Sequence, residues 1–592
     1  MENQQQFEKN LNFFASGNPR HAIRAGEVDP AAPIDYDAEK WFQGLPLNHQ
    51  DVLYIFGIDS GQAYEAAKEW LGGNPCRHIV FLEDDIRRIR RFLEEKNAED
   101  LLLNPRSHIF AFSEISEEDP LLDLLAWSFT QQQIFFAPLP HYRDRRSAEC
   151  RMLEQLILYE SAHKNEIIDE YMKYGVVFYR NFYHNLMQLH NCYSGNKLFG
   201  QFQNVPAIIC GAGPSLKKNI HLLKDLKERA LILAGGSSLN ALCKEGILPH
   251  FGAGIDPNPT QYYRFMGHSV KNIPFFFRPR MNYKAFRSLT GPRLYINGAG
   301  GYDTAEWFER ELGIEGSIPD EGHNVVNFCT AIASELGCSP IIFVGMDLAY
   351  SDLKSYAEGV VDDPSVTEEQ LTQTGLFETS AVVRKDIYGD KVYTMWKWIA
   401  ESVWLSDFAE KYPDLTIINA TEGGIGFEGI PNEPLTDVIK KHLQKEYPFD
   451  SDIPSKIEQA AMPHVSCERV LASVHKLRKS LERCVEAFDV LIEEGNRIQK
   501  LVEVGDIPET MQTGLQALTE TELAEEPAYE AVLEIFNTMF SHIKQRDYQS
   551  AKLERDERKR KIKHLELTDE KYLFLRQVAE ANLILIREAL NS

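Results

Sequence analysis

In the middle of the chain, short runs of apolar residues alternate with segments whose apolar residues recur every three or four positions. The runs have the length and composition of buried strands, and the segments have the periodicity of amphipathic helices. This alternation predicts an α/β domain with a mostly parallel sheet. The predicted strands are 207–210, 230–234, 249–255, 274–277, 293–296, 340–344 and 417–419.

A smaller copy of the pattern lies near the N-terminus. A βαβ unit followed by an acidic residue indicates a small Rossmann-like domain, in which Glu83 is the candidate partner of a ribose hydroxyl. A turn that binds no ligand is the alternative, because Asp59 would repel a phosphate. The predicted elements are strands at 52–56 and 78–82, a helix at 63–71 between them, and further strands within 101–112 and at 135–138.

Three other segments differ from these two. Residues 145–202 have helical periodicity, residues 348–395 form a long polar excursion typical of a lid or a disordered loop, and the chain after 435 is almost wholly helical. We therefore expect four parts: a Rossmann-like domain at 1–145, a helical connector at 146–202, a central α/β domain at 203–435 and an all-helical domain at 436–592.

Composition narrows the class of protein. A chain of 592 residues should form several domains, and its net charge of −25 argues against a general nucleic-acid binder. The nine cysteines include no C-x-x-C pair, so we expect reduced core residues and no zinc or disulfide framework. Without an N-terminal signal sequence or a long apolar run, the sequence predicts a cytoplasmic protein with no membrane segment.

The segment 207–220, AIICGAGPSLKKNI, combines a buried strand, a glycine turn and the start of a helix. Glycine permits a close approach of a ligand, and free amides at a helix start bind anions. The segment lacks the third glycine of a dinucleotide fingerprint and the spacing of a Walker A loop. A plain strand-to-helix turn is the alternative to a phosphate site. The predicted phosphate-binding residues are Gly211, Gly213, Pro214 and Ser215.

Several other polar residues follow predicted strands, where ligands of open α/β sheets gather. Ser237 and Asn258 are candidate nucleotide contacts, and Asp256 is a candidate anchor for a ribose or a base, with a turn cap as its alternative. Asp347 is a candidate base or metal ligand, or a carboxylate bonded to nearby amides. His323, at a helix start, is a candidate base or phosphate donor, or a structural residue. Glu422, beside glycines, could also reach such a site.

Four motifs occur in an order that resembles one family. They are GAGPSLKKNI, LPHFGAGIDPNP (248–259), ELGCSPIIFVGMDLAYSDLKSYAEG (335–359) and NATEGG (419–424), and together they resemble the motility-associated factor (Maf) glycosyltransferases of bacteria. Residues 7–11 and 51–85 look like that family's N-terminal domain. The resemblance implies transfer of a nonulosonic acid, of the pseudaminic or legionaminic type, from a CMP-activated donor to Ser or Thr of flagellin.

The same resemblance implies a central domain similar to bacterial sialyltransferases, with a GT-A-like fold whose glycine turn holds CMP. Ala212 stands where those enzymes have Asn, and no His lies between Asp347 and Asn419 to serve as the base. A wider resemblance is to the 6-hydroxymethylpterin diphosphokinase (MptE-like) group, which uses ATP and Mg²⁺. In that case Asp256 and Asp347 would be the metal ligands. A non-catalytic scaffold that binds flagellin is a third hypothesis, and the helical C-terminal region is expected to recognise the acceptor protein.

Overall fold

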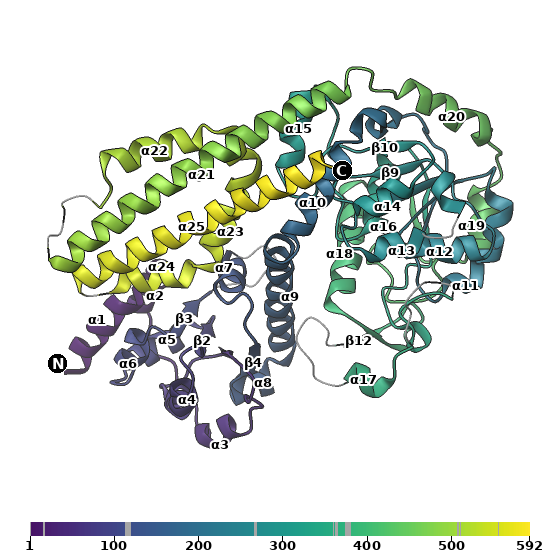
Figure 1. Ribbon diagram of the computed structural model, residues 1–592. Helices are drawn as coiled ribbons and strands as arrows, with labels where there is room; N and C mark the ends of the chain where they lie inside the picture. Colours follow the sequence, from purple (N-terminus) through teal and green to yellow (C-terminus); the bar gives the residue numbers. More distant parts are fainter. Residues whose placement is uncertain are drawn as a thin grey trace. The chain divides into compact units, whose positions relative to one another are not determined.

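The structure is a computed structural model that describes residues 2–15, 18–112, 120–265, 269–358, 360, 365–372, 381–505, 508, 511–554 and 556–592 (Figure 1). The chain forms two compact units. The first contains residues 1–168 together with 541–554, and the second contains 169–540 together with 555–592. The first unit therefore takes in a short segment from the C-terminal helical region. The boundaries of the four predicted domains stay a prediction.

The first unit is built around a four-stranded parallel sheet in the order β3-β2-β1-β4. Its two central strands, β1 (Val52–Phe56) and β2 (His78–Glu83), are buried throughout, which explains why they read as continuous apolar runs. The edge strands are β3 (Ser107–Ala111) and β4 (Ile134–Pro138). The predicted Rossmann-like βαβ pattern is confirmed.

Helices surround this sheet. They are α1 (Glu2–Ala15), α2 (Pro19–Glu27), α3 (Ala38–Gln43), α4 (Gln62–Gly72), α5 (Ile86–Leu93), α6 (Ala98–Leu103), α7 (Pro120–Ser128), α8 (Pro140–Arg145) and α24 (Gln545–Leu553). The long helix α9 (Ser147–Met172) follows α8. Arg546 of α24 lies 2.9 Å from the His78 ring at the start of β2, so the late segment is joined to the sheet by a polar contact.

The second unit contains an eight-stranded parallel sheet in the order β14-β11-β6-β7-β8-β9-β10-β5. All seven predicted central strands are present. They are β6 (Ala207–Cys210), β7 (Leu231–Gly235), β8 (Phe251–Gly254), β9 (Phe275–Phe277), β10 (Arg293–Tyr295), β11 (Ile341–Val344) and β14 (Ile417–Asn419). The short edge strand β5 (Tyr193–Ser194) lies in the stretch expected to be a helical connector.

The helices of the α/β part are α10 (Gly175–Leu186), α11 (Leu216–Asn219), α12 (Ser237–Lys244), α13 (Thr260–Phe265), α14 (Tyr283–Ser288), α15 (Thr304–Leu312), α16 (Val325–Glu335) and α19 (Leu435–His442). The helix predicted to start after the glycine turn is present but short, because α11 ends at Asn219 and a 3-10 helix continues to Leu226. The α-helical part of this segment is therefore short.

The polar excursion at 348–395 is partly ordered. It contains α17 (Glu368–Thr372) and an antiparallel hairpin of β12 (Val382–Lys385) and β13 (Lys391–Thr394), and is followed by α18 (Trp396–Lys411). Residues 359, 361–364 and 373–380 of this excursion lie outside the described residues. The prediction of an irregular loop over the whole stretch is therefore wrong for the hairpin.

The C-terminal part is helical, as predicted. It comprises α20 (Phe449–Gln459), α21 (Cys467–Val504), α22 (Gly514–Ala524), a π-helix (Tyr529–Leu533), α23 (Glu534–Ile543) and α25 (Glu557–Leu590). The long helices α21 and α25 run side by side (Figure 1). α25 also packs on the α/β part, because the Tyr183 hydroxyl donates to Asn582 Oδ1 at 2.8 Å. In the described part of the chain, no helix is long and apolar enough to cross a membrane.

Candidate functional site

The topology of the larger sheet singles out one point on its carboxyl edge. The chain passes from β6 through β10 in one direction, and then β11 returns to the other side of β6. In open α/β sheets ligands bind outside the carboxyl ends of the strands at such a switch point. The glycine turn Gly211–Ser215 follows β6, and Asp347 follows the adjacent strand β11. Two of the predicted groups of site residues therefore meet there.

At the switch point Asp347 is bonded to the glycine turn itself. Its carboxylate accepts a hydrogen bond from the Ser215 hydroxyl at 2.6 Å and from the Ser215 N–H at 3.2 Å to each oxygen. Ser351 Oγ donates to its Oδ2 at 2.6 Å. Asp347 is only 1% exposed, and this burial raises the pKa of its carboxyl group, although the hydrogen bonds from Ser215 and Ser351 oppose the shift.

Glycines make this close approach possible. A Cβ atom on Gly211 would overlap the carbonyl of Gly345, and one on Gly213 would overlap Asp347 Oδ1. The Gly211 N–H donates to Val344 O at 2.8 Å, and the Gly213 N–H donates to Gly345 O at 2.7 Å. The backbones of the two turns are thus hydrogen-bonded to each other, and there is no room for side chains between them.

These contacts change the interpretation of the glycine turn. The N–H groups of Gly211, Gly213 and Ser215, which we expected to hold a phosphate, all donate within the protein. Asp347 places a carboxylate where the phosphate would lie, and Pro214 has no N–H to offer. The arrangement matches the alternative reading of Asp347, a carboxylate bonded to nearby amides, and gives the turn a structural role.

The neighbouring strand end offers a different anion site. Helix α12 starts at Ser237, directly after β7, and no side chain caps its N-terminus. Gly236 (φ +55°), Ser237 and Ser238 are nevertheless buried. A buried helix start needs hydrogen-bond acceptors for its first N–H groups, and an anion supplies both the acceptors and a charge that suits the helix dipole. Ser237 is therefore better placed for a phosphate than Ser215.

One further predicted residue, His323, lies at the same edge. A Cβ atom on Gly235, the last residue of β7, would overlap the side chain of Val325, so the start of α16 lies against the end of β7. His323, which precedes Val325 by two residues, is half-buried, and its N–H donates to Asn327 Oδ1 at 3.2 Å. The structure thus brings His323 to the β7 end of the sheet, away from the Asp347 carboxylate contacts.

Asp256 and Asn258 follow β8, the next strand along. Asp256 Oδ1 accepts a hydrogen bond from the Asn258 N–H at 2.9 Å, which makes a local turn. Burial alone would lower the pKa of Arg280, but the charges of Glu321 and Glu170, and to a smaller extent that of Asp256, raise it. Arg280 Nη1 donates to Glu321 Oε1 at 2.7 Å. Asp256 thus faces a buried ion-pair network that the sequence did not predict.

Comparison with known proteins bears on this edge of the sheet. The sequence model of the family described as 6-hydroxymethylpterin diphosphokinase MptE-like matches residues 180–353. Residues 180–353 form an MptE-like domain. The domain contains the glycine turn, the strand ends that carry Ser237, Asp256 and Asp347, and His323 before α16. The recognition of this domain from the motifs is therefore confirmed.

Two individual proteins are also similar. An uncharacterized protein of Treponema pallidum (strain Nichols) is 39% identical over 69 residues, which are 12% of this chain and 31% of that protein. The match thus spans about a third of the relative's length. A solved structure of a MAf glycosyltransferase from Magnetospirillum magneticum AMB-1 aligns with 97% of this chain and 88% of that chain, at 15% identity and a TM-score of 0.49. We draw no functional conclusion from that likeness.

The MptE-like domain allows a test of the predicted metal site. β11 and β8 are separated by β6 and β7, so Asp347 and Asp256 follow strands about 14 Å apart at roughly 4.8 Å per strand. Mg²⁺ binds its oxygen ligands at about 2.1 Å. The two carboxylates face different partners, Ser215 and Asn258, and they do not fit one shared ion. The prediction that they form a joint magnesium site is not supported by this geometry.

Other candidate residues also have local partners. Glu422 (φ +60°) accepts a hydrogen bond from Leu435 N at 3.2 Å, so its carboxylate caps α19. In the first unit, Glu83 is fully buried. It accepts hydrogen bonds from the Ile58 and Asp85 N–H groups, each at 2.8 Å, and from the Tyr142 hydroxyl at 2.6 Å. The proposed contact of Glu83 with a ribose is therefore wrong: both oxygens are used inside the protein.

Sequence reasoning missed several residues that build this edge. Thr421 Oγ1 accepts a hydrogen bond from Met346 N at 3.1 Å, and a Cβ atom on Gly424 would overlap the Asp347 backbone. Both belong to the motif at 419–424. A signal was present, because this motif follows β14, the strand next to β11. In the described residues, no group of three or more His, Cys, Asp or Glu side chains is arranged to hold a metal ion.

Proposed function

We propose that this protein is a glycosyltransferase of the Maf type. In this proposal it transfers a nonulosonic acid from a CMP-activated donor to Ser or Thr of flagellin or a similar protein. The ordered motifs support the proposal, and most of them lie in the MptE-like domain. The observation that carries it is the buried, uncapped start of α12, where the phosphate of a nucleotide would complete the hydrogen bonding.

The residues near that helix start suit the transfer chemically. The reaction needs a base that removes the acceptor's hydroxyl proton, and donors that stabilise the departing phosphate. His323 is the proposed base, since it precedes Val325, which packs against Gly235 at the end of β7, and imidazole is a common general base. The N–H groups of Ser237 and Ser238 would stabilise the phosphate, and Asp256 with Asn258 would contact the ribose or the base. Asp347 is proposed to position the glycine turn.

A diphosphokinase that uses ATP and Mg²⁺ is the second candidate, favoured by the description of the matching family. It requires carboxylates that share an ion. The wide spacing of Asp256 and Asp347 supports the glycosyltransferase instead.

Calorimetric titration of the full chain with CMP, CDP, ATP and GTP, each with and without Mg²⁺, tests the two candidates. Ser237→Asp is the informative variant, because its carboxylate would cap α12 and repel a phosphate. We expect one CMP-binding site that is independent of Mg²⁺ and is lost in Ser237→Asp without a lower melting temperature. Ser147→Asp, the same change at the exposed start of α9, is the matched control and should bind as the wild type.

ATP binding that requires Mg²⁺ would favour the diphosphokinase. Absence of any nucleotide binding would favour the non-catalytic scaffold. Recognition of the acceptor by the C-terminal helices needs a separate test. Deletion after residue 450 is unsuitable, because Ser194 N donates to Ala460 O and Tyr183 donates to Asn582, so the deletion would damage the α/β part.

Point variants avoid this damage. Leu515 and Leu518 lie one turn apart on α22 and are 50% and 56% exposed. If α22 contacts the acceptor, Leu515→Ser with Leu518→Ser should weaken co-purification with flagellin at least tenfold. Val176→Ser, an equally exposed residue of α10, is the control. Unchanged co-purification by the double variant would remove α22 from the proposed interface.

A further inference from the structure

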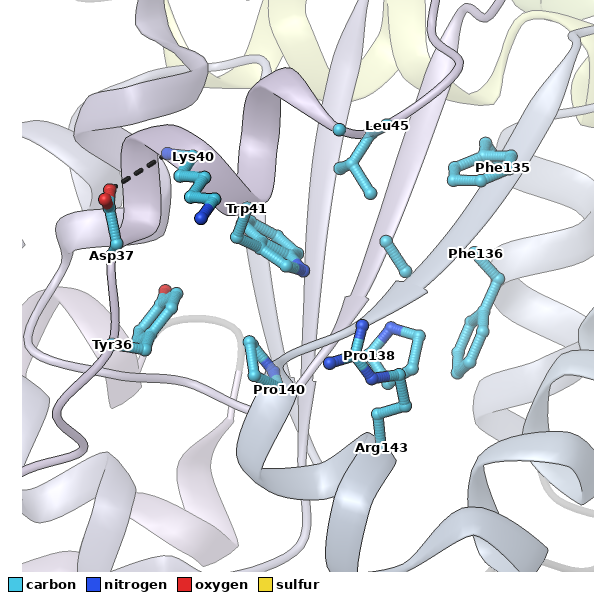
Figure 2. Close-up of a pocket in the computed structure, with 12 residues that line it drawn as sticks. Tyr36, Asp37, Lys40, Trp41, Leu45, Phe135, Phe136, Pro138, Pro140 and Arg143 are labelled. Carbon is cyan, nitrogen blue, oxygen red and sulfur yellow. Dashed lines mark hydrogen bonds between the residues drawn. The ribbon is translucent and has the colours of Figure 1, made fainter.

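The first unit contains a cavity of about 510 Å³, within the range of small-molecule sites. It lies beside β4, an edge strand of the sheet that pairs with β1 on the side opposite to β2. Figure 2 shows Tyr36 and Trp41 on one side of it and Phe135 and Phe136 on the other. The lining residues are Tyr36, Asp37, Lys40, Trp41, Gly44, Leu45, Phe135–Pro138, Pro140 and Arg143.

The walls of the cavity are flat, apolar and held in place. The rings of Tyr36 and Trp41 meet edge to face, with their centroids 6.2 Å apart. The Tyr36 hydroxyl donates to Asp59 Oδ2 at 2.5 Å, and Asp59 also accepts from the first N–H groups of α4. The tyrosine is thus tied to the turn after β1. Asp59, which we expected to repel a phosphate there, instead caps a helix and holds a cavity wall.

The strand that borders the cavity offers polar groups as well. Four consecutive residues of β4 line it, and since side chains of a strand alternate between faces, the cavity runs along the strand's outer edge. Leu139 N donates to Phe56 O and Val52 N donates to Gln133 O, so odd-numbered backbone groups of this strand face β1. The N–H and C=O of Phe136 therefore point to the outer edge.

Two cations stand at the cavity. Arg143 lies on α8, where its guanidinium donates to the exposed neighbour Asp144 at 3.1 Å. In the part of the chain that the structure describes, no carboxylate is within ion-pair distance of the Lys40 ammonium. Asp37 also lines the cavity, but its carboxylate accepts from the Lys40 N–H at 3.0 Å and caps α3. An anionic group on a ligand could form ion pairs with these two side chains.

We propose that this cavity binds a nucleotide whose base carries, on its Watson–Crick edge, an amino group next to an unprotonated ring nitrogen, as adenine and cytosine do. The base would lie against Trp41, its amino group would donate to Phe136 O, and its ring nitrogen would accept from Phe136 N. Uracil and guanine present the wrong pattern of donors and acceptors to that edge. The phosphate would pair with Lys40 and Arg143. This site is separate from the proposed transfer in the second unit.

Calorimetry with AMP, CMP, UMP and GMP on the full chain tests the inference. We expect AMP or CMP to bind at least tenfold more tightly than UMP and GMP. Trp41→Ala should weaken that binding at least tenfold, and Trp41→Phe should restore most of it, which separates loss of stacking from loss of folding. Lys40→Gln with Arg143→Gln should weaken the binding of AMP more than that of adenosine, and should reduce the salt dependence of AMP binding.

Controls assign each result to one unit. Lys96→Gln with Arg151→Gln removes two exposed cations of the first unit that lie outside the cavity, and should leave binding unchanged. Ser237→Asp should abolish nucleotide binding in the second unit only. Binding that survives all cavity variants but is lost in Ser237→Asp would overturn the inference and leave the proposed transfer intact. Equal binding of all four nucleotides, or of none, would overturn it as well.

Discussion

The carboxylate of Asp347 accepts hydrogen bonds from both the N–H and the hydroxyl of Ser215, the latter at 2.6 Å. A buried carboxylate that loses a donor costs about 1–3 kcal/mol. We therefore expect Ser215→Ala to raise the amide hydrogen-exchange rates of residues 207–216. Ser288→Ala is the control, since its hydroxyl donates to the neutral Ala285 carbonyl in a half-buried position and should matter less. Equal increases of the exchange rates in the two variants would show that the hydrogen bond to Asp347 stabilises no more than the bond to the neutral carbonyl.

Gly213 offers a steric test of the same contact. Its Cβ position is occupied by Asp347 Oδ1, so Gly213→Ala must separate the two turns. We expect a loss of roughly 1–3 kcal/mol, the usual cost of overpacking, and a lower melting temperature. Gly72→Ala is the control, because nothing lies within 4 Å of its Cβ position in α4. That change should be neutral or slightly stabilising, since alanine favours a helix. A neutral Gly213→Ala would contradict the tight packing.

The buried carboxyl group of Glu83 should make the stability of the first unit depend on pH. Burial raises its pKa from 4.5 to about 7, against the opposing hydrogen bonds from Tyr142, Asp85 and Ile58. Between these values the folded protein holds the proton more tightly than the unfolded chain. Stability should therefore fall as the pH rises from 4.5 to 7, by up to about 3 kcal/mol, and stay level above that range.

Hydrogen exchange of β1 and β2 at pH 5 and pH 8 measures this effect. Glu83→Gln should remove most of the difference between the two pH values, because glutamine does not titrate. Tyr142→Phe should destabilise the unit at both, since it removes the hydroxyl that donates to Glu83. A pH difference that persists in Glu83→Gln would assign it to other groups.

The strands of both sheets could be predicted from the sequence because they are buried on both faces. β6, β7 and β11 appear as continuous apolar runs between glycine turns. The hairpin of β12 and β13 was missed, because β12 alternates between half-buried and exposed residues and carries charges. Periodicity alone does not distinguish such a strand from a polar loop.

The candidate site was predicted less well, for a physical reason. A strand end identifies which residues reach the carboxyl edge, but their partners depend on contacts between distant positions. Ser215 and Asp347 are 132 residues apart and satisfy each other, and Glu83 and Tyr142 do the same over 59 residues. Each of these residues resembled a ligand contact only while its partner was unknown. The role of Ser237 stays a prediction, and no side chain caps the helix that starts there.

The helix pair of α21 and α25 provides a last prediction. Gly495 of α21 leaves space for Asp569 of α25, since a Cβ atom there would overlap Asp569 Oδ1. That oxygen is buried and has no hydrogen-bond partner in the described part of the chain, and burial raises the pKa of the carboxyl group to about 6. Stability of the helix pair should therefore decline as the pH rises from 3.8 to 6.

A double-mutant cycle measured by urea unfolding at pH 8 tests this relationship. Gly495→Ala alone should destabilise the pair through the overlap. Asp569→Ala alone should be neutral or stabilising, because it removes a half-buried carboxylate whose Oδ1 has no hydrogen-bond partner in the described part of the chain. The double variant should exceed the wild type in stability, since alanine at 495 favours the helix once the overlap is gone. We expect a coupling of about 1–3 kcal/mol, and additive effects of the two changes would show that the residues do not touch.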